Sequence, residues 1–551
     1  MQRQFCFENL ESRRLLAIIT VNTLQDIVDP DDQWTSLREA VRTANTTFDM
    51  DEIRFHESLS GGTIELRRGE MEIASGSPVK IVGPGADLLT IDASTSDPTP
   101  DLNLGDGSRI FLNLEGEISG LTLTGGDVSW WPGGGAIVAG RLVVRDMIFR
   151  ENHSADEAGA IRALGDLQVY DSWFDQNSAG DDGGAIYGVI PSIRVESSVF
   201  THNFTYGWGG ADGGAIAARS TLGEFVISNS TFSGNEIQGS GAGGAIDYGG
   251  SSAGVIVNST IVNNSSSFAP GLSIREGEFQ IRNTVIANNV GGIEGDLHLG
   301  VPEVTIDGVL IGNAAQLFVG DDPKVHFGRS ENPLDPALSP LIDDGISFPY
   351  HMPEPGSPLI DGGVEAVDEG RDYDQRGMPH WRSVGAVDIG AVEFLGAGDR
   401  NGNEIADASD IDTLCTAIHE QSLDLSFDMD GNSAVELLDI EHLMSRWRTG
   451  PGDVNLDRQF DSADLVGVFS AAEYRDDLVG NSRWSTGDWD CDGDFDTSDL
   501  VVAFQAAWFE QGRRLAVVTR HSDVAAATHG LSDAIETDEA EDETKLRRLI
   551  R

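Results

Sequence analysis

Basic residues, cysteine and aromatic residues are all scarce in this chain of 551 residues. Lys and Arg together number 36 against 91 Asp and Glu, which gives a formal net charge of −55. A surface this acidic repels nucleic acids and anionic membranes, so we expect cations or neutral glycans as partners and no nucleic acid. Three cysteines are too few for a disulfide framework. No apolar run approaches the roughly 18 residues of a membrane span, so none is expected.

Glycine is abundant instead, with 66 residues, and this composition favours a turn-rich β protein. A short glycine-rich phrase, written GGAI in its commonest form, recurs along the chain. The residue that closes it is Ile at 137, 161, 186, 216, 246 and 274. About half a period later an apolar residue is followed by x-x-Asn, in the pairs Phe149/Asn152, Phe174/Asn177, Phe200/Asn203, Phe232/Asn235, Ile261/Asn264 and Ile286/Asn289.

Short alternating runs such as LVVRDMIF lie between these marks and predict strands with one buried face. Two to three short strands per period form one turn of a solenoid. We therefore predict a mainly β fold, a right-handed parallel β-helix over residues 21–330. The Ile positions would stack inside it as one ladder and the Phe positions as another. The repeated Asn would satisfy backbone groups at a corner or adopt left-handed dihedrals there, and the paired glycines would permit a tight turn.

The GGAI phrase and the F-x-x-N mark resemble the repeats of polymorphic outer-membrane proteins. TSLREAVRTAN, residues 35–45, is similar to the CSLREA element, with Thr35 in place of its cysteine. Downstream, SPLIDGGVEAVDEGRDYDQRG and VGAVDIGAVEF resemble the terminal region of the choice-of-anchor Q family, which we assign to residues 331–396. These resemblances imply a secreted or cell-surface bacterial β-helix, and the family carries no assigned catalytic residues.

Residues 1–20 are predicted to be an export or sorting segment. FENLESRRLLAIITV has Arg13 and Arg14 before a short apolar stretch, which is close to the lower limit of about 7 residues for a signal sequence. The segment resembles the LEPR-XLL sorting element, with Ser12 in place of its proline. The alternative is an ordinary first β-strand after a charged start.

A different composition begins at Gly398, where four acidic segments have Asp or Asn at loop positions 1, 3 and 5 and Asp at position 12. Calcium takes about 6 to 8 oxygen ligands, and a loop that wraps once around the ion supplies them. An apolar helix-like run follows each loop. The predicted ligands are Asp399, Asn401, Asn403 and Asp410 in the first loop, Asp428, Asp430, Asn432 and Asp439 in the second, Asp453, Asn455, Asp457 and Asp464 in the third, and Asp488, Asp490, Asp492 and Asp499 in the last.

Such loops in pairs resemble the type I dockerin, and two dockerin-like modules fit, at residues 398–448 and 452–510. The resemblance implies Ca²⁺ as cofactor and a cohesin-like protein as one partner; solvated acidic loops are the alternative. Position 6 is glycine only at Gly493, and the other loops carry Glu404, Ser433 and Arg458 there, which costs up to about 1 kcal/mol in a sharp turn. The tail, residues 512–551, has an acidic block and then a basic cluster, which predicts disorder or one short helix.

Three acidic residues stand four positions before a ladder Ile: Glu157, Asp182 and Asp212. If they stack at about 4.8 Å, their like charges are costly unless a cation binds or a proton is retained. Trp208 lies in a loop beside this corner and could stack on a sugar ring. We predict a glycan-binding or acid cluster here; the alternative is a solvated turn whose acids point apart.

Two classes of function remain open. The first is a non-enzymatic extracellular protein, adhesive, glycan-binding or structural, that is joined through calcium-dependent modules to the cell surface or to an extracellular polysaccharide. The alternative is a polysaccharide-degrading enzyme, a glycoside hydrolase or polysaccharide lyase, which dockerin-like modules often accompany. Of the strings NTD, DD, GHG and RIK that mark galacturonases with this fold, only DD occurs, as at Asp181-Asp182.

Overall fold

The computed structural model describes residues 17–47, 50–74, 76–99, 103–129, 131–189, 192–206, 210–219, 223–301, 304–315, 324–364, 373–382, 386–395, 398–403, 405–429, 432–447, 449–506 and 508–511. Most of the predicted export segment and the tail after residue 511 lie outside these residues. The chain divides into two compact units, Met1–Trp447 and Arg448–Arg551. The finer domain boundaries predicted above stay predictions.

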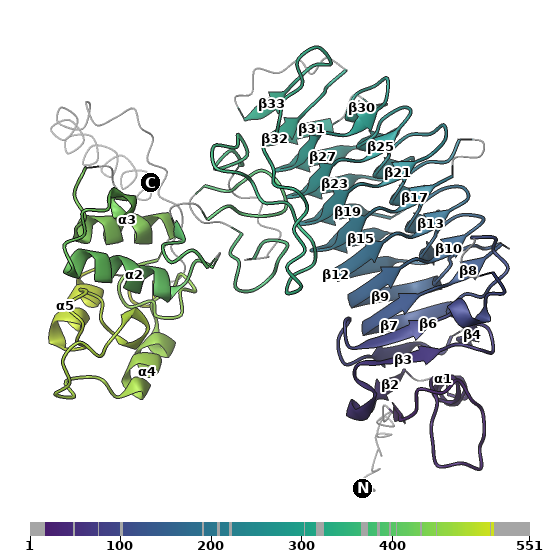
Figure 1. Ribbon diagram of the computed structural model, residues 1–551, viewed down its shortest axis with the longest axis horizontal. Coiled ribbons are helices and arrows are strands. Elements are labelled where there is room, and N and C mark those ends of the chain that lie inside the picture. The colour runs from purple at the N-terminus through teal and green to yellow at the C-terminus, as the bar shows by residue number, and fades with distance from the viewer. Residues whose placement is uncertain are drawn as a thin grey trace, which may run out of the picture. The chain divides into compact units, whose positions relative to one another are not determined.

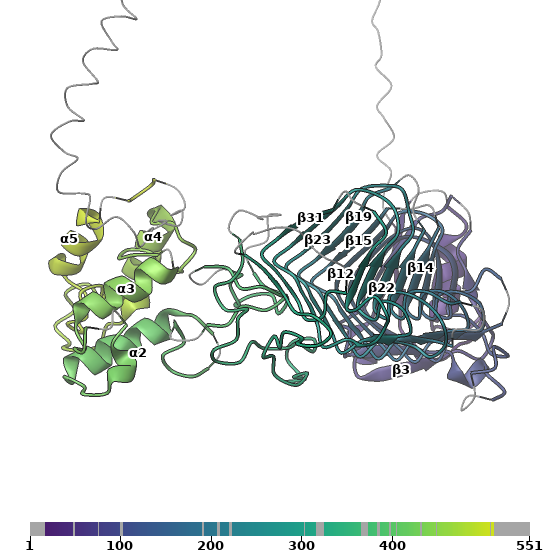
Figure 2. The same ribbon diagram turned by 90° about the horizontal axis from the view of Figure 1, so that it is seen from above.

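The first unit contains a parallel β-solenoid of about nine turns, whose strands stack along its length (Figures 1 and 2). The opening turns use β1 (Ile18–Val21), β2 (Asp51–Phe55), β3 (Gly62–Glu65), β4 (Met71–Glu72), β5 (Val79–Val82), β6 (Leu89–Asp92) and β7 (Phe111–Thr124). Helix α1 (Leu37–Ala44) lies at this end, and its apolar residues join the solenoid core. The single-turn helices η1 (Glu57–Leu59) and η2 (Ser94–Ser96) lie in the connecting loops. The predicted parallel β-solenoid is thereby confirmed.

Later turns contribute one strand to each of four rows. The first row is β9 (Ile137–Arg150), β11 (Ile161–Ala163), β14 (Ile186–Gly188), β18 (Ile216–Ala218), β22 (Ile246–Tyr248), β26 (Leu272–Ile274) and β30 (Leu297–Leu299). The second row continues from β9 through β12 (Leu167–Asp175), β15 (Ile193–Glu196), β19 (Phe225–Ser228), β23 (Gly254–Val257), β27 (Phe279–Arg282) and β31 (Val304–Asp307). The third row passes from β12 to β16 (Val199–Thr201), β20 (Thr231–Ser233), β24 (Thr260–Val262), β28 (Val285–Ala287), β32 (Val309–Ile311) and β33 (Val325–Phe327). The fourth is a separate sheet of β8 (Asp127–Val128), β10 (His153–Ser154), β13 (Ser178–Ala179), β17 (Phe204–Thr205), β21 (Glu236–Ile237), β25 (Ser265–Ser266) and β29 (Val290–Gly291).

The predicted Ile ladder is confirmed over five turns, because Ile137, Ile161, Ile186, Ile216 and Ile246 are aligned in parallel register and fully buried. The prediction of Ile274 as its sixth member is wrong. The residue that pairs with Ile246 is Leu272, whereas Ile274 pairs with Tyr248. The reason is local: the sixth turn reads APGLSI, so the glycine-rich phrase is broken and both Leu272 and Ile274 face the core.

The Phe ladder is confirmed by direct ring stacking. The centroids of Phe149 and Phe174 lie 4.6 Å apart, and the two following pairs, to Phe200 and Phe232, are each 4.7 Å apart with nearly parallel planes. Ile261 and Ile286 continue the row in register. Ring spacing therefore follows strand spacing, and the rings fill the core as a continuous column.

The predicted role of the repeated Asn in satisfying backbone groups is confirmed. The Asn203 Nδ2 donates to Phe174 O and to Asn235 Oδ1, both at 2.9 Å, and its Oδ1 accepts the Asn177 N–H at 3.0 Å. The same pattern joins Asn152, Asn177, Asn203, Asn235, Asn264 and Asn289. The left-handed residue at this corner is the one before the Asn, for example His202 with φ 54°.

A second left-handed corner separates the second and third rows. Its residues have φ between 45° and 65° and are Gly120, Asp146, Asp171, Ser197, Asn229, Asn258, Asn283 and Gly308. Glycine, asparagine and aspartate tolerate this conformation best, which explains their prevalence at the position.

The described residues between 331 and 395, which are 331–364, 373–382 and 386–395, are irregular and pack along the third row. Ser233 Oγ bonds His351 Nε2 at 2.9 Å, the Ala391 N–H donates to Thr260 Oγ1 at 3.0 Å, and Thr231 bonds Gln375. Leu359 and Ile389 share a buried cluster with Val285 and Leu310. The segment thus covers outward-facing residues of the solenoid.

The α-helices of the chain's C-terminal third follow the four predicted loops. In the first unit these are α2 (Ala408–His419) and α3 (Leu437–Trp447), with η4 (Leu425–Phe427) between them, and Cys415 of α2 is disulfide-bonded. In the second unit, α4 (Ser462–Ala471), η5 (Trp484–Thr486) and α5 (Thr497–Gln505) surround an aromatic core that includes Phe460 and Trp484. Cys491 is also disulfide-bonded.

Candidate functional site

Glu157, Asp182 and Asp212 occupy one corner of three successive turns. The register of the ladder Ile residues fixes this placement. Main-chain hydrogen bonds join the same corner of successive turns: the Ala158 N–H donates to Asp182 O, and the Gly183 N–H donates to Asp212 O. Each glycine that follows Asp182 and Asp212 is left-handed, with φ 69° at Gly183 and 67° at Gly213. The two aspartates therefore precede a left-handed position that glycine adopts easily, and Ala158 holds the same position after Glu157 with φ 62°.

The two aspartates of this corner accept main-chain hydrogen bonds from the following turn. Asp182 Oδ1 accepts the Asp212 N–H at 2.8 Å, and Asp212 Oδ1 accepts the Ala242 N–H at 2.9 Å. Each carboxylate thus ties its own turn to the next one.

Two arginines neutralise the corner. Arg219 Nη2 lies 3.2 Å from Asp182 Oδ2 and 2.9 Å from Asp212 Oδ2, and its Nη1 lies 2.5 Å from Asp247 Oδ2. Arg275 pairs with Asp212 and reaches Asp247 Oδ1 at 3.0 Å. The cation that the stacked acids require is therefore supplied by the chain itself, and this network was not foreseen from the sequence.

Burial dominates the titration of the corner. It raises the pKa of Asp182 to about 6, against the opposing effect of Arg219. Burial likewise raises the pKa of Asp247 to about 6, although Arg219 stabilises its charge. Glu157 is the third predicted acid: burial raises its pKa, and it pairs with Arg162, whose guanidinium lies 4.9 Å from the centre of the Tyr187 ring. Trp208 lies outside the described residues.

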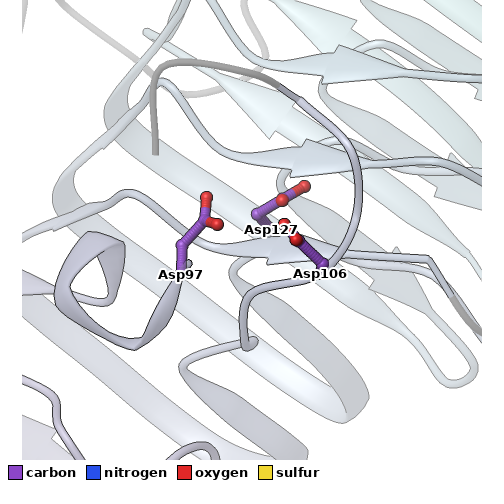
Figure 3. A group of neighbouring side chains, drawn as sticks. All are labelled: Asp97, Asp106 and Asp127. Atoms are coloured by element: carbon purple, nitrogen blue, oxygen red, sulfur yellow. The ribbon is translucent and has the colours of Figure 1, made fainter. Parts of the chain in front are cut away.

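A second acidic cluster lies at the fourth row of strands, where Asp97, Asp106 and Asp127 converge from three segments (Figure 3). One oxygen of each lies within 4.8 Å of the others. Both oxygens of Asp127 accept the Gly105 N–H at 2.9 Å, and Thr99 Oγ1 donates to Asp106 Oδ1 at 2.9 Å. Burial, with the charge of Asp97, raises the pKa of Asp127 to about 6. Sequence reasoning missed this cluster because its members share no repeated mark.

His153 of β10 lies against the same cluster. Its Nε2 is 4.0 Å from Asp127 Oδ1, and its Nδ1 bonds Ser178 Oγ at 2.9 Å. Burial lowers the pKa of His153 to about 4, so the ring is neutral at physiological pH. The cluster therefore gains no positive charge from this histidine.

In all four acidic loops the Asp at position 12 is fully buried and accepts main-chain hydrogen bonds from both ends of the loop. The donors are the N–H groups of positions 2 and 9, and in two loops also of position 3, at 2.6 to 3.2 Å. These acceptors are Asp410, Asp439, Asp464 and Asp499. Each also stands in the first turn of the following helix, and in α2, α4 and α5 it completes a capping box.

Position 1 closes the other side of each loop. Asp453 Oδ1 accepts the Asp457 N–H at 3.0 Å and its Oδ2 the Arg458 N–H at 2.9 Å, and Asp399, Asp428 and Asp488 accept in the same way. Position 6 is left-handed in three loops, with φ 72° at Ser433, 69° at Arg458 and 91° at Gly493. Glu404 and the predicted ligand Asp430 lie outside the described residues.

The acids of the last loop converge. One oxygen each of Asp488, Asp490 and Asp492 lies within 4.8 Å of the others. Asp488 is 6% exposed, and its Oδ1 has no hydrogen-bond partner among the described residues. Burial, with the charges of Asp499, Asp492 and Asp490, raises the pKa of Asp488 to about 7. An unpartnered buried carboxylate oxygen beside two further carboxylates fits a hard cation such as Ca²⁺.

No model of a known protein family matches the chain, and no curated protein is significantly similar to it. Within the described part of the chain, no helix has the length and apolar character that crossing a bilayer would need.

Proposed function

We propose that the protein is a secreted or cell-surface β-solenoid, right-handed in its coil, that binds glycans or adheres, and that two dockerin-like modules attach it in a calcium-dependent manner. The observation that supports the modules most directly is in the last loop, where Asp488 Oδ1 is buried next to Asp490 and Asp492 and has no hydrogen-bond partner within the described part of the chain. Ca²⁺ bound there would offset the mutual repulsion of the three carboxylates.

The other three loops support the same proposal through their shared geometry. In each, positions 1 and 12 are held by main-chain N–H groups, so their carboxylates stay at the loop interior. A cohesin-like protein is the partner class that we propose for the modules, and an extracellular polysaccharide or cell-surface component is the one for the solenoid.

The contacts of Asp182 and Asp212 favour a binding function of the solenoid over a catalytic one. A glycoside hydrolase or lyase needs a carboxyl group or base that can exchange a proton with its substrate. Asp182 and Asp212 are instead engaged by Arg219 and by main-chain N–H groups. We therefore propose that the solenoid is a binding scaffold, and a polysaccharide-degrading enzyme is the second candidate.

Calcium titration calorimetry on the full chain tests the modules. The wild type should bind Ca²⁺, and Asp488→Asn combined with Asp490→Asn should remove one binding event. Asp477→Asn is the control, since this exposed residue lies outside the loops and asparagine tolerates its φ of 66°. Absence of calcium binding by the wild type would contradict the proposal.

A further inference from the structure

The fourth row of strands begins with three buried polar residues in one file. Asp127, His153 and Ser178 are paired in register on β8, β10 and β13, and they are 4%, 3% and 1% exposed. A loop lies across them, since Asn103 Nδ2 donates to Ser178 Oγ at 3.2 Å and the Gly105 N–H donates to Asp127. The later turns hold at this position Phe204, Glu236, Ser265 and Val290. The solenoid therefore does not require a buried acid or histidine there.

The acids of this cluster have no basic partner within the described part of the chain. Asp97 and Asp106 approach Asp127 so that one oxygen of each lies within 4.8 Å of the others (Figure 3). The corner acids of the first row pair with two arginines, whereas no described Lys or Arg forms an ion pair with any of these three carboxylates. Carboxylates this close repel one another unless they share a proton or bind a cation.

His153 provides an independent indication of a bound cation. Its Nδ1 bonds Ser178 Oγ at 2.9 Å, and its Nε2 lies 4.0 Å from Asp127 Oδ1 with no hydrogen-bond partner among the described residues. With the ring proton on Nδ1, where Ser178 Oγ accepts it, Nε2 presents a lone pair to the cluster. The side chain is 4% exposed, so an acceptor that faces a carboxylate oxygen here is unfavourable unless a cation lies between them.

The distances fit one shared metal ion. Bonds from Zn²⁺ to His N and Asp O are about 2.0 to 2.2 Å long, so two of its ligand atoms lie at most about 4.3 Å apart. His153 Nε2 and Asp127 Oδ1 meet this limit, and small movements would bring Asp97 and Asp106 within it. An imidazole ligand favours a transition metal over Ca²⁺ or Mg²⁺, and a hydrogen bond at its other nitrogen is the usual means of orienting it.

We propose that Asp97, Asp106, Asp127 and His153 bind one divalent transition-metal ion. Asp127 and His153 come from β8 and β10, whereas Asp97 follows η2 and Asp106 stands in the loop over the row. The ion would therefore fasten this loop to the outer face of the solenoid, and its charge would offset the repulsion among the carboxylates. The site is separate from the four acidic loops and independent of the function proposed above.

The test is calorimetric titration of the full chain with Zn²⁺ in excess Ca²⁺, which occupies sites that prefer hard cations. The wild type should bind Zn²⁺ in an event that Asp106→Asn and His153→Gln each weaken at least tenfold. Asparagine at 106 keeps an acceptor for Thr99 Oγ1, and the position is exposed, so the thermal midpoint of the metal-free variant should not fall. Asp31→Asn is the matched control, because Asp31 is an exposed acid of another loop. Its Zn²⁺ affinity should change less than twofold.

Absence of Zn²⁺ binding by the wild type would overturn the inference. Equal affinities of the wild type and Asp106→Asn would also overturn it, since the ion would then lie elsewhere, and so would equal losses in Asp106→Asn and Asp31→Asn. Binding that depends on Asp106 but is abolished by excess Ca²⁺ would overturn the assignment to a transition metal. A His153→Gln variant that keeps the wild-type thermal midpoint and the wild-type Zn²⁺ affinity would overturn the role of the imidazole. If His153→Gln does not fold, Asp106→Asn decides alone.

Discussion

Asp212 donates its main-chain N–H to Oδ1 of Asp182 in the preceding turn at 2.8 Å, and Arg219 bridges the other oxygens of both carboxylates. Stacked acids need a cation or a retained proton, and here the cation is an arginine of the same solenoid. The corner therefore combines two functions of the carboxylate, acceptance of a backbone hydrogen bond and pairing with a guanidinium. Both functions stabilise the joint between turns.

We predict that Asp182→Ala destabilises the solenoid by about 1 to 3 kcal/mol at neutral pH, because the Asp212 N–H loses its acceptor. Asp182→Asn should cost less, since its amide oxygen still accepts this hydrogen bond. Denaturant unfolding measures both, with Asp181→Ala at an exposed neighbouring position as control. Unchanged stability together with lost glycan retention would instead assign Asp182 to a binding site.

Removal of a ladder side chain should be more damaging. Ile186→Ala is expected to cost about 2 to 5 kcal/mol, and Phe200→Ala a similar amount, because a cavity opens between stacked turns. Glu196→Ala is the control: Arg194 and Glu196 form an ion pair at 2.9 Å on the outward face of β15. It should cost less than Ile186→Ala, because Glu196 lies outside the apolar core and its truncation opens no cavity there. Equal losses for Glu196→Ala and Ile186→Ala in urea unfolding would mean a register error of one residue.

The sequence predicts the core better than the surface, because core positions repeat with the turn. Ile137 to Ile246 follow from the glycine-rich phrase, and the Phe column follows from the F-x-x-N mark. The prediction fails at Ile274, where the phrase is interrupted and two inward-facing residues, Leu272 and Ile274, stand in one short strand. Periodicity alone does not choose between them.

The partners of the corner acids are not predicted, although a signal exists. Arg219 and Arg275 each stand three residues after the ladder residue of their own turn, Ile216 and Leu272. Because turns stack in register, this shared position brings both arginines to the same face. The Asp97, Asp106 and Asp127 cluster had no such signal, since its residues come from irregular loops of the early turns.

Asp127 predicts a specific pH dependence. Burial raises its pKa to about 6 from the ordinary 3.8, so the unfolded chain releases this proton at lower pH than the folded chain. The folded state should therefore lose stability from this group as the pH rises from about 4 to about 6. Asp127→Asn removes that loss of stability. In calorimetry at pH 4, 5, 6 and 7, the thermal midpoint of the variant should therefore rise relative to that of the wild type as the pH increases. The exposed Glu276→Gln should show no such trend. If Asp127→Asn shows no such trend either, the Asp127 carboxyl is not held in a buried, repulsive setting.

The four loops should differ in calcium affinity according to the charge of their ligands. Positions 1, 3, 5 and 12 of the last loop hold four carboxylates, Asp488, Asp490, Asp492 and Asp499, whereas the first loop holds two, Asp399 and Asp410. Calorimetric titration should therefore lose its tightest event in Asp488→Asn and its weakest in Asp399→Asn. The reverse assignment would show that ligand charge does not set the order.

Thermal unfolding of the full chain in excess Ca²⁺ and in excess chelator, followed by the helical circular dichroism signal, tests the central claim most directly. Ligands that bind only the folded state raise its stability, and helices α2 to α5 begin at the loops that would hold the ion. We predict that Ca²⁺ raises the midpoint of the helical transition, and that Asp488→Asn combined with Asp490→Asn reduces this increase while Asp477→Asn does not. Identical melting curves of the wild type in calcium and in chelator would contradict the account.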